Sequence, residues 1–364
     1  MSKIVVGMSG GVDSAVTAYL LKAAGHDVIG MTLKTWLNSE GEVSRCCEID
    51  DARRTAHVLD IPYYAVNAAG DFRKFVVEPF TAAYIGGMTP NPCIECNRAV
   101  KWKGMLDFAD SMGAQFVATG HYSYIEKCEN GRYAVKRSAY ANKDQTYMLY
   151  RLTQQQLART LMPLGALDKS EVRKIAEAAG LPIAAKPDSQ EICFVADDDY
   201  ANYIEHNSGE YIPQSGSFVD ESGKVLGTHK GIIHYTVGQR KGLGIAMGYP
   251  VYVKSINAAS NEVVLSDDNS LYNNIIKVDT LNFQSIPDIP QGEKVRALVR
   301  IRYHHAGEYG DIEKTGDDEV TIRFDKPVRA PAPGQSAVFY DEKGRVIGGG
   351  RIISSKNTQI GNNG

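Results

Sequence analysis

The sequence predicts an α/β domain with a parallel sheet, followed by a half built of β-strands, and two patterns support this division. The apolar segment 3–8 precedes a helical pattern over 12–24 and a second apolar segment over 27–33, which is the rhythm of a βαβ unit. From about residue 211, helical periodicity gives way to short alternating segments separated by Gly, Asn and Asp, which is typical of small barrels or sandwiches. With 364 residues, of which 43% are hydrophobic, the chain exceeds what one hydrophobic core usually organises, so two or three domains are expected.

Helices and strands continue to alternate through the first half. The helix predicted over 169–179 stops at Gly180, a common helix boundary. The other predicted elements are helices over 52–59, 71–85 and 99–112 and strands over 63–66 and 116–119. Ligands of open α/β sheets gather beyond the carboxyl ends of the strands, where Ser9, Leu33 and Gly120–His121 would lie. Three separate segments therefore converge on one crevice.

The second half consists of short predicted strands with frequent turns between them. These strands cover 262–266, 294–303, 319–324 and 336–340. The proline-rich stretch 286–290 offers a joint within this half. We therefore expect one α/β domain followed by two small β-rich domains, with the polar, glycine-rich residues 357–364 as a frayed tail.

The most informative segment is Ser9-Gly10-Gly11-Val12-Asp13-Ser14, directly after the first apolar strand. Two glycines at the end of a strand let backbone N–H groups approach an anion closely, and the following helix points its positive end at the same place. A Walker loop would carry a lysine where Val12 and Asp13 stand, so an ordinary kinase or GTPase loop is excluded. The segment resembles the signature of the PP-loop ATP pyrophosphatases, which cleave ATP between its α and β phosphates to adenylate a substrate.

Composition narrows the class of protein further. The formal net charge of −3 neither supports nor excludes nucleic-acid binding, because a basic face can be hidden within a balanced total. No apolar run is long enough to span a bilayer, and Met1-Ser2-Lys3 leads into a core strand without a signal-peptide pattern, so we expect a cytoplasmic protein with no membrane partner. Six cysteines in a reducing compartment point to redox, nucleophilic or metal chemistry rather than to a disulfide framework.

The cysteines are candidates for that chemistry. Cys93-Ile94-Glu95-Cys96 is a C-x-x-C pair just before a helix, whose dipole favours the thiolate. A second such pair is absent, which weakens a structural zinc site, because structural zinc needs four protein ligands. Cys193 is the natural third member, although an isolated Cys between Ile and Phe is more often an inert buried residue. Adjacent Cys46 and Cys47 and the hairpin residue Cys128 are assigned no role.

The similarity to a known family extends well beyond the phosphate loop. The chain carries, in this order and over nearly its whole length, the motifs SGGVDS, NPCIECNRAVKW, TGHY, NKDQTYMLYRL, DSQEICF and HYTVGQRKGLGI. Together they resemble the tRNA-specific 2-thiouridylase family. The resemblance implies a Rossmann-like PP-loop catalytic domain over 1–208, a small central β-rich domain over 209–275 and a C-terminal β-barrel over 276–356. It also implies an enzyme that uses ATP and Mg²⁺ to install sulfur at the 2-position of the tRNA wobble uridine, with sulfur from a persulfide donor such as a cysteine desulfurase or a relay protein.

The family's binding positions carry over residue by residue. The implied nucleotide-binding positions are Gly7, Met8, Ser9, Gly10, Gly11, Val12, Asp13, Ser14, Leu33 and Gly120. The implied tRNA-contacting positions are Asn91, Pro92, Cys93, His121, Lys143, Asp144, Gln145, Arg302, Tyr303 and Gln335. Leu33 stands where the family commonly has Met before Lys-x-Trp, so it matches by position and only loosely by type. A backbone contact would tolerate this difference.

For catalysis, the resemblance implies that Cys96 is the nucleophile, that Cys193 carries persulfide sulfur and that Asp13 supports the ATP chemistry. Adenylation turns the uridine carbonyl oxygen into a leaving group, after which sulfur attacks the ring carbon and AMP departs. Many members carry Asp where this chain has Cys93. Three thiols at Cys93, Cys96 and Cys193 would suit a [4Fe–4S] cluster with an open iron for hydrosulfide, so a cluster route stays open beside the persulfide–disulfide route.

Two other functions remain as alternatives. A PP-loop synthetase adenylates a small carboxylate or carbonyl and passes it to nitrogen, which needs ammonia delivery rather than the pair Cys96 and Cys193. A non-catalytic RNA-binding or iron–sulfur scaffold would carry a vestigial loop, whereas Gly10, Gly11 and Asp13 are intact. Release of pyrophosphate from ATP would exclude the second alternative.

Overall fold

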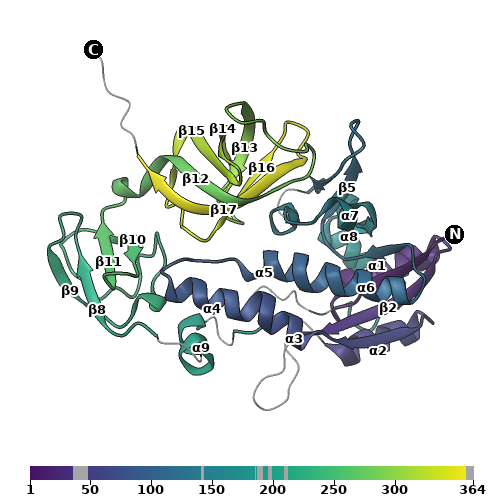
Figure 1. Cartoon of the computed structure of the whole chain (residues 1–364). Coiled ribbons are helices and arrows are strands. Elements are labelled where there is room, and N and C mark those ends of the chain that lie inside the picture. Colours follow the sequence, from purple (N-terminus) through teal and green to yellow (C-terminus); the bar gives the residue numbers. More distant parts are fainter. Residues whose placement is uncertain are drawn as a thin grey trace.

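The computed structural model describes residues 1–35, 48–140, 143–184, 186, 192–195, 199–208 and 212–357. Cys46, Cys47, residues 188–191 of the DSQEICF motif and residues 358–364 of the predicted tail lie outside the described residues. Figure 1 shows an α/β part and a small sheet at opposite ends of the molecule, with a closed barrel above the helices between them. The predicted fold class is therefore confirmed. Within these ranges, no helix combines the length and apolar character needed to cross a membrane.

The α/β part is built on a five-stranded parallel sheet with the order β3-β2-β1-β4-β7. Its strands are β1 (Lys3–Gly7), β2 (Asp27–Lys34), β3 (Tyr63–Asn67), β4 (Phe116–Ala118) and β7 (Thr160–Leu161). Residues of β1 alternate between two hydrophobic clusters, with Val5 in one and Ile4 and Val6 in the other. All three are fully buried, because helices cover both faces of a parallel sheet.

The two faces of the sheet carry different helices. The face of Ile4 and Val6 packs against α1 (Val12–Ala23), α2 (Ile49–Val58) and α8 (Lys169–Ala178). The face of Val5 packs against a continuous helix made of α5 (Pro92–Glu95), the π-helical η2 (Cys96–Trp102) and α6 (Lys103–Ser111). This helix begins seven residues before the predicted start at 99, because Asn91 caps it and Pro92 suits its first turn.

A second helical stretch carries the chain away from the sheet toward the small sheet (Figure 1). It consists of α3 (Ala69–Phe72), the π-helical η1 (Arg73–Val77) and α4 (Glu78–Ile85), and α9 (Tyr200–Asn207) packs beside it. Their apolar side chains, with those of the 92–102 helix, form one buried cluster that we call the α4–α9 cluster; it includes Phe72, Phe80, Tyr84, Cys96, Phe194 and Tyr203. The first half also contains the hairpin β5 (Ser123–Lys127) and β6 (Tyr133–Arg137), α7 (Gln154–Ala158) and the short helices η4 (Thr146–Leu149) and η5 (Pro163–Ala166).

The two β-rich units of the second half have different topologies. The small sheet has the order β10-β11-β8-β9, with β8 (Gly216–Val219), β9 (Val225–His229), β10 (Tyr252–Asn257) and β11 (Glu262–Ser266). The closed barrel has the order β12-β15-β14-β13-β16-β17, with β12 (Tyr272–Phe283), β13 (Lys294–Arg300), β14 (Glu308–Gly316), β15 (Glu319–Arg329), β16 (Ser336–Tyr340) and β17 (Val346–Lys356). Neighbouring barrel strands are antiparallel, and closure removes the exposed edges of the sheet. Short helices η7 (Ile232–His234) and η8 (Asn269–Leu271) lie in the connections.

Gln284 fastens the barrel to the α/β part. It follows β12 and is completely buried. Its Nε2 donates to the backbone oxygens of Leu149 and Tyr150, both at 3.0 Å, and its Oε1 accepts from the backbone N–H of Val135 at 3.0 Å. One side chain therefore satisfies backbone groups of two separate segments of the other unit.

Replacement of Gln284 by Leu should destabilise the protein, because buried backbone groups would lose their partners at a cost of about 3 kcal/mol. Thermal unfolding measures the effect. The matched control is Gln291→Leu at an exposed turn residue, which should unfold close to the wild-type temperature. Equal unfolding temperatures for the two variants would contradict the role given to Gln284.

Candidate active site

The predicted phosphate loop, residues 7–14, joins β1 to α1 at the carboxyl edge of the sheet. Gly10 has a φ of +82°, and a Cβ there would lie 2.6 Å from the backbone oxygen of Glu48, so only glycine fits. The Ser9 N–H donates to the Ser14 hydroxyl at 3.1 Å, which donates to the Gly11 oxygen at 3.0 Å. In the described part of the chain, no side chain caps the N-terminus of α1. Hydrogen bonds within the loop therefore hold its conformation. The first backbone N–H groups of α1 have no side-chain cap and are the kind of group that binds an anion.

Gly7 and Gly120 allow close packing around this loop. A Cβ on Gly7 would lie 2.7 Å from the Met105 sulfur of α6. A Cβ on Gly120 would lie 2.7 Å from the backbone carbon of Asp13 and 2.8 Å from the backbone nitrogen of Ser14. The structure therefore brings Gly120 together with the predicted loop residues. Met8 and Val12 are buried beneath the loop, so only their backbone atoms are in a position to meet a ligand.

The Asp13 carboxylate is the centre of a polar group beside the loop. Lys169 Nζ donates to Asp13 Oδ1 at 2.7 Å and to Oδ2 at 2.8 Å, and the Tyr122 hydroxyl donates to Oδ1 at 2.7 Å. Neither Lys169 nor Tyr122 is among the site residues predicted from the sequence. A signal for Lys169 was available, because the capping box of Asp168 and Glu171 makes it the first residue of α8. The N-terminus of a helix that follows a parallel strand lies at the carboxyl edge of the sheet.

Leu33 lies at the end of β2 and lines a cavity that is separate from the phosphate loop. The cavity has a volume of about 430 Å³ and is also lined by Val66, Asn67, Val100, Gly104 and Phe108, among others. A Cβ on Gly104 would lie 3.0 Å from Leu33 Cδ2, so the leucine side chain packs against α6. None of the loop residues 7–14 lines this cavity. The structure thus places Leu33 at the expected edge of the sheet but on the α6 face.

Cys96 and Cys193, far apart in the sequence, pack against the same α4–α9 cluster. Cys96 begins η2 and is 6% exposed, whereas Cys193 is partly exposed. The neighbouring Phe194 anchors the segment of the second cysteine, because its ring centre lies 5.5 Å from that of Phe72 and 5.3 Å from that of Phe80, both in T-shaped contacts. The structure therefore brings the predicted nucleophile and the predicted sulfur carrier into one neighbourhood.

Cys93 faces the barrel. Asn91 Oδ1 accepts from the Cys93 N–H at 3.1 Å, and Pro92 is buried. Burial raises the pKa of Tyr303, with Asp144 and Cys93 adding to the shift, so Cys93 is near the barrel residue Tyr303. In the described ranges, no three His, Cys, Asp or Glu side chains are grouped so as to hold a metal ion.

The predicted tRNA positions 143–145 differ in their exposure. Asp144 is 5% exposed, and Arg300 of the barrel donates to its Oδ2 at 2.9 Å. Gln145 Oε1 accepts from the Tyr122 N–H at 3.0 Å. Lys143 is partly exposed. The Asp144 carboxylate thus joins the barrel to the α/β part instead of facing solvent.

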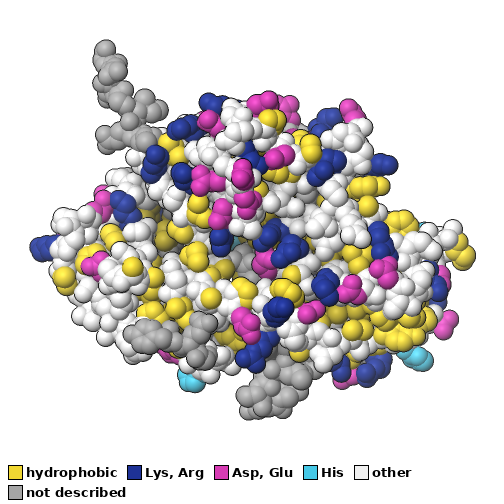
Figure 2. Space-filling view, in the orientation of Figure 1, with side chains coloured by type: hydrophobic (Ala, Val, Ile, Leu, Met, Phe, Trp, Pro, Cys, Tyr) yellow, Lys and Arg dark blue, Asp and Glu magenta, His cyan; other side chains and the backbone are white. Residues whose placement is uncertain are grey.

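The predicted tRNA positions of the barrel lie where it meets the 89–93 segment. Gln335 Nε2 donates to the Thr89 oxygen at 2.9 Å, and Tyr303 lies near Cys93. Arg302 donates to the backbone oxygen of Arg329. Figure 2 shows Lys and Arg side chains near the middle of this face, where the barrel meets the helices. The structure therefore brings the predicted positions of the barrel and of residues 91–93 together.

His121 is partly buried next to Gly120. Its Nδ1 lies 2.9 Å from the Thr119 hydroxyl, and its ring centre lies 5.4 Å from that of Trp102. Burial, together with the positive charge of Lys101, lowers the pKa of His121 to about 3. The imidazole is therefore neutral at physiological pH and carries no positive charge.

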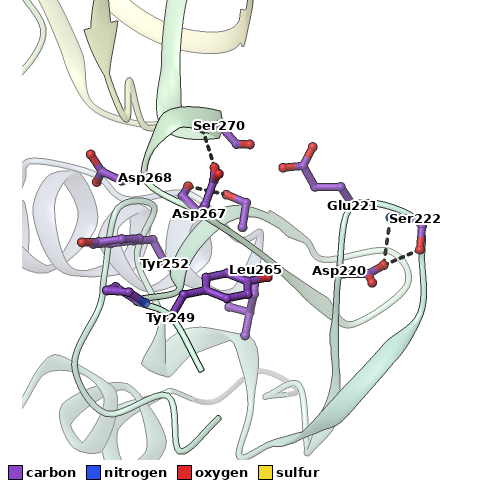
Figure 3. A pocket seen from close by; sticks show the side chains of 11 residues that line it. Asp220, Glu221, Ser222, Tyr249, Tyr252, Leu265, Asp267, Asp268 and Ser270 are labelled. Carbon is purple, nitrogen blue, oxygen red and sulfur yellow. Dashed lines mark hydrogen bonds between the residues drawn. The ribbon is translucent and has the colours of Figure 1, made fainter. Parts of the chain in front are cut away.

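Another cavity, of about 730 Å³, lies beside the small sheet and involves none of the predicted site residues. Figure 3 shows four carboxylates around it, those of Asp220, Glu221, Asp267 and Asp268. Glu221 pairs with Lys254 and Asp268 with Arg329. Because carboxylates repel phosphates, this cavity suits neither a nucleotide nor an RNA backbone.

Comparisons with known proteins cover almost the whole chain. Three family models match it in succession: a tRNA methyl transferase HUP domain over residues 2–197, a tRNA methyl transferase PRC-barrel domain over 201–267 and an aminomethyltransferase beta-barrel domain over 273–352. The chain is 50% identical to a protein of Lachnoclostridium phytofermentans named tRNA-specific 2-thiouridylase MnmA, over 97% of this chain and 100% of that one. Proteins of the same name from Acetivibrio thermocellus (48% identity, 96% and 99% covered) and Clostridioides difficile (46% identity, 96% and 98% covered) are also similar.

The low pKa of His121 predicts a pH-dependent stability. In the unfolded chain the His121 side chain takes up a proton near pH 6.5, whereas in the folded chain it does so only at about pH 3. The contribution of neutral His121 to the free energy of unfolding is therefore complete above pH 6.5 and is lost as the pH falls toward 3. His121→Gln, which keeps hydrogen-bonding capacity without titrating, should weaken the fall in unfolding temperature between pH 7 and pH 5. Replacement of the exposed His57 by Gln is the control and should leave the fall unchanged. An equal fall in wild type and His121→Gln would refute the assignment.

Proposed function

The chain belongs to the tRNA-specific 2-thiouridylase family, and we propose that it catalyses the ATP-dependent 2-thiolation of the wobble uridine of tRNA. The observation that carries the proposal is that Cys96 and Cys193 pack against one cluster. Cys96 also lies on the helix whose Met105 packs against Gly7 of the phosphate loop. In this proposal, residues 1–208 hold the nucleotide and sulfur chemistry, 209–275 form the central domain and 276–356 form a barrel that helps to hold tRNA. Since tRNA is a cytoplasmic substrate, we place the reaction in the cytoplasm.

The first half-reaction activates the uridine. The 2-oxygen of uridine attacks the α-phosphorus of ATP, a new oxygen–phosphorus bond forms, and pyrophosphate leaves with the electron pair of the broken bond. The glycine amides of the loop and the N-terminus of α1 meet the charge that develops on the phosphates, and Mg²⁺ bound with ATP adds charge neutralisation. Gly10 and Gly120 support this role, because a side chain at either position would collide with backbone.

The second half-reaction transfers sulfur. Cys193 carries a persulfide loaded by an external persulfide donor, and the Cys96 thiolate attacks the Cys193 sulfur. A disulfide forms between the two cysteines, and hydrosulfide leaves. Hydrosulfide attacks C2 of the adenylated uridine, AMP departs, and a dithiol reductant reduces the disulfide for the next turnover. The packing of both cysteines against one buried cluster supports this route.

The tRNA surface runs along the junction of the barrel with the α/β part. Asn91, Pro92 and Cys93 would meet the target base, because this loop faces the barrel and precedes Cys96 directly. Lys143 and Arg302 would contribute cations for the phosphate backbone. His121 would offer a neutral hydrogen-bonding group beside the nucleotide.

The central test is thiolation of unmodified tRNA with ATP and a persulfide donor. Cys96→Ser and Cys193→Ser should each abolish 2-thiouridine formation while pyrophosphate release stays within about threefold of wild type, because activation uses the other end of the 92–111 helix. Cys128→Ser, at a buried hairpin cysteine outside the cluster, is the matched control and should thiolate normally. Sulfur transfer by either of the first two variants would refute the assigned roles, and no thiolation by wild type would refute the function.

Cys93 distinguishes the persulfide route from a cluster route. In the persulfide route, Cys93→Ala prepared without oxygen should contain no iron, like wild type, and should still form 2-thiouridine, since only two cysteines take part. Iron content and visible absorbance are measured beside activity. Iron in wild type, with iron and activity both lost in Cys93→Ala, would replace the persulfide route by one through a [4Fe–4S] cluster at Cys93, Cys96 and Cys193.

A further inference from the structure

Two arginines share one carboxylate on the helix that carries Cys93 and Cys96. Glu95 lies in α5, between these two cysteines. Its Oε2 accepts from Arg98 Nη2 at 2.9 Å and from Arg98 Nε at 3.2 Å, and its Oε1 accepts from Arg151 Nη1. All three side chains are partly exposed. We call Glu95, Arg98 and Arg151 the two-arginine cluster.

The two-arginine cluster carries a net positive charge. In the described part of the chain, neither Arg98 nor Arg151 pairs with a second carboxylate. One negative charge therefore faces two positive charges. Each guanidinium has more N–H groups than Glu95 occupies, so both arginines keep donors for a further anion.

Stability alone does not account for the second arginine. Arg98 stands three residues after Glu95 on the same helix, a spacing at which such a pair forms without further help. Arg151 comes from a distant segment, and its charge repels that of Arg98. Its Nε is buried and has no hydrogen-bond partner among the described residues, which costs free energy. A ligand that takes up the surplus charge explains why both arginines converge on one carboxylate.

The backbone that carries the two arginines is held in place. Gln156 Nε2 donates to the backbone oxygen of Arg98 at 3.0 Å. Asn282, at the end of the barrel strand β12, donates through Nδ2 to the backbone oxygen of Tyr150 at 2.6 Å, directly before Arg151. Because these segments are already ordered, binding of an anion between the guanidinium groups costs little additional order.

The place of the two-arginine cluster favours an RNA phosphate as this anion. In Figure 1, α5 lies in the middle of the molecule, below the barrel, and Figure 2 shows Lys and Arg side chains at this junction. The segment 91–93, which we assign to the target base, ends two residues before Glu95. Phosphates join the target uridine to the nucleotides on either side, so the RNA backbone must pass close to this segment. Arginine suits a phosphate, because its planar fork donates to two oxygens at once.

We propose that Arg98 and Arg151 together bind a backbone phosphate of the tRNA anticodon loop beside the target uridine, with Glu95 as their positioning residue. The inference rests on the proposed function, since it extends the surface assigned to tRNA. A phosphate contact reads no base, but it fixes the register of the RNA on the protein. The two arginines hold the strand while the target base occupies the segment 91–93.

The test measures affinity for an unmodified tRNA transcript over a series of salt concentrations. Arg98→Met and Arg151→Met should each weaken binding about 10-fold, because each removes charged hydrogen bonds. The slope of log affinity against log salt concentration should become shallower by roughly 0.7 to 0.9, the value for one phosphate contact. Arg53→Met is the matched control and should bind like wild type, because Arg53 pairs with Asp50 on α2 at the same spacing as Arg98 with Glu95.

Glu95→Gln separates a phosphate site from a structural ion pair. This variant loses the carboxylate but keeps both cations, so its salt slope should equal that of wild type. A purely structural cluster would instead give Glu95→Gln and Arg151→Met the same effect on binding. Thermal unfolding is measured beside affinity. If Arg151→Met unfolds more easily, the double variant with Glu95→Gln removes the carboxylate that lost its partner, and it should fold yet still bind tRNA weakly with a shallower salt slope.

Two results would overturn the inference. One is wild-type affinity and salt slope in folded Arg98→Met and Arg151→Met. The other is slower loading of persulfide onto Cys193 with unchanged tRNA affinity, which would assign the cluster to an acidic donor protein. Failure of wild type to thiolate a tRNA that it binds would refute the proposed function, and the salt series would still decide the role of the two arginines.

Discussion

The docking of the barrel onto the α/β part is the constraint on which the shape of the candidate site depends. Gln284 holds the backbone at Leu149 and Tyr150, and the buried pair of Arg300 with Asp144 adds a second attachment. Separation of the two units would leave these buried polar groups without partners, which would cost free energy. The contacts therefore hold the two units in one relative position. That position brings Tyr303 to Cys93. The surface that we assign to tRNA exists only while these contacts hold.

The continuous helix from Pro92 to Ser111 links the two halves of the proposed chemistry. Cys96 lies near its start, and Met105 packs under Gly7 of the phosphate loop. Nine residues separate these positions, which is roughly 13 Å along a helix at 1.5 Å per residue. In the proposed mechanism, the phosphorus bonds to the 2-oxygen of uridine and sulfur attacks the adjacent C2, so both reacting groups would have to meet at one point of the base. One rigid element that carries Cys96 and supports the phosphate loop would help to keep these groups in a fixed relation.

Much of the fold could be predicted from the sequence, because periodicity and glycine placement are local signals. The strand before Ser9, the sheet and the β-rich second half follow from such patterns. Gln284 could not be found in this way, since it acts through contacts with residues more than a hundred positions away. The contact between Asp144 and Arg300 could not be predicted either, because the residues around Asp144 in the sequence do not indicate whether its carboxylate is buried or exposed.

The different exposure of the two cysteines supports the division of labour between them. A sulfur carrier must be loaded by a second protein, so its thiol needs access to solvent, and Cys193 is partly exposed. Hydrosulfide is best released at a site that excludes water, because water would hydrolyse the adenylated uridine. Cys96, the thiol that releases it in the proposed route, is only 6% exposed. Exchange of the two roles would place the loaded sulfur on the more buried of the two thiols. Burial alone, without any difference in residue type, therefore favours Cys193 as the carrier and Cys96 as the nucleophile.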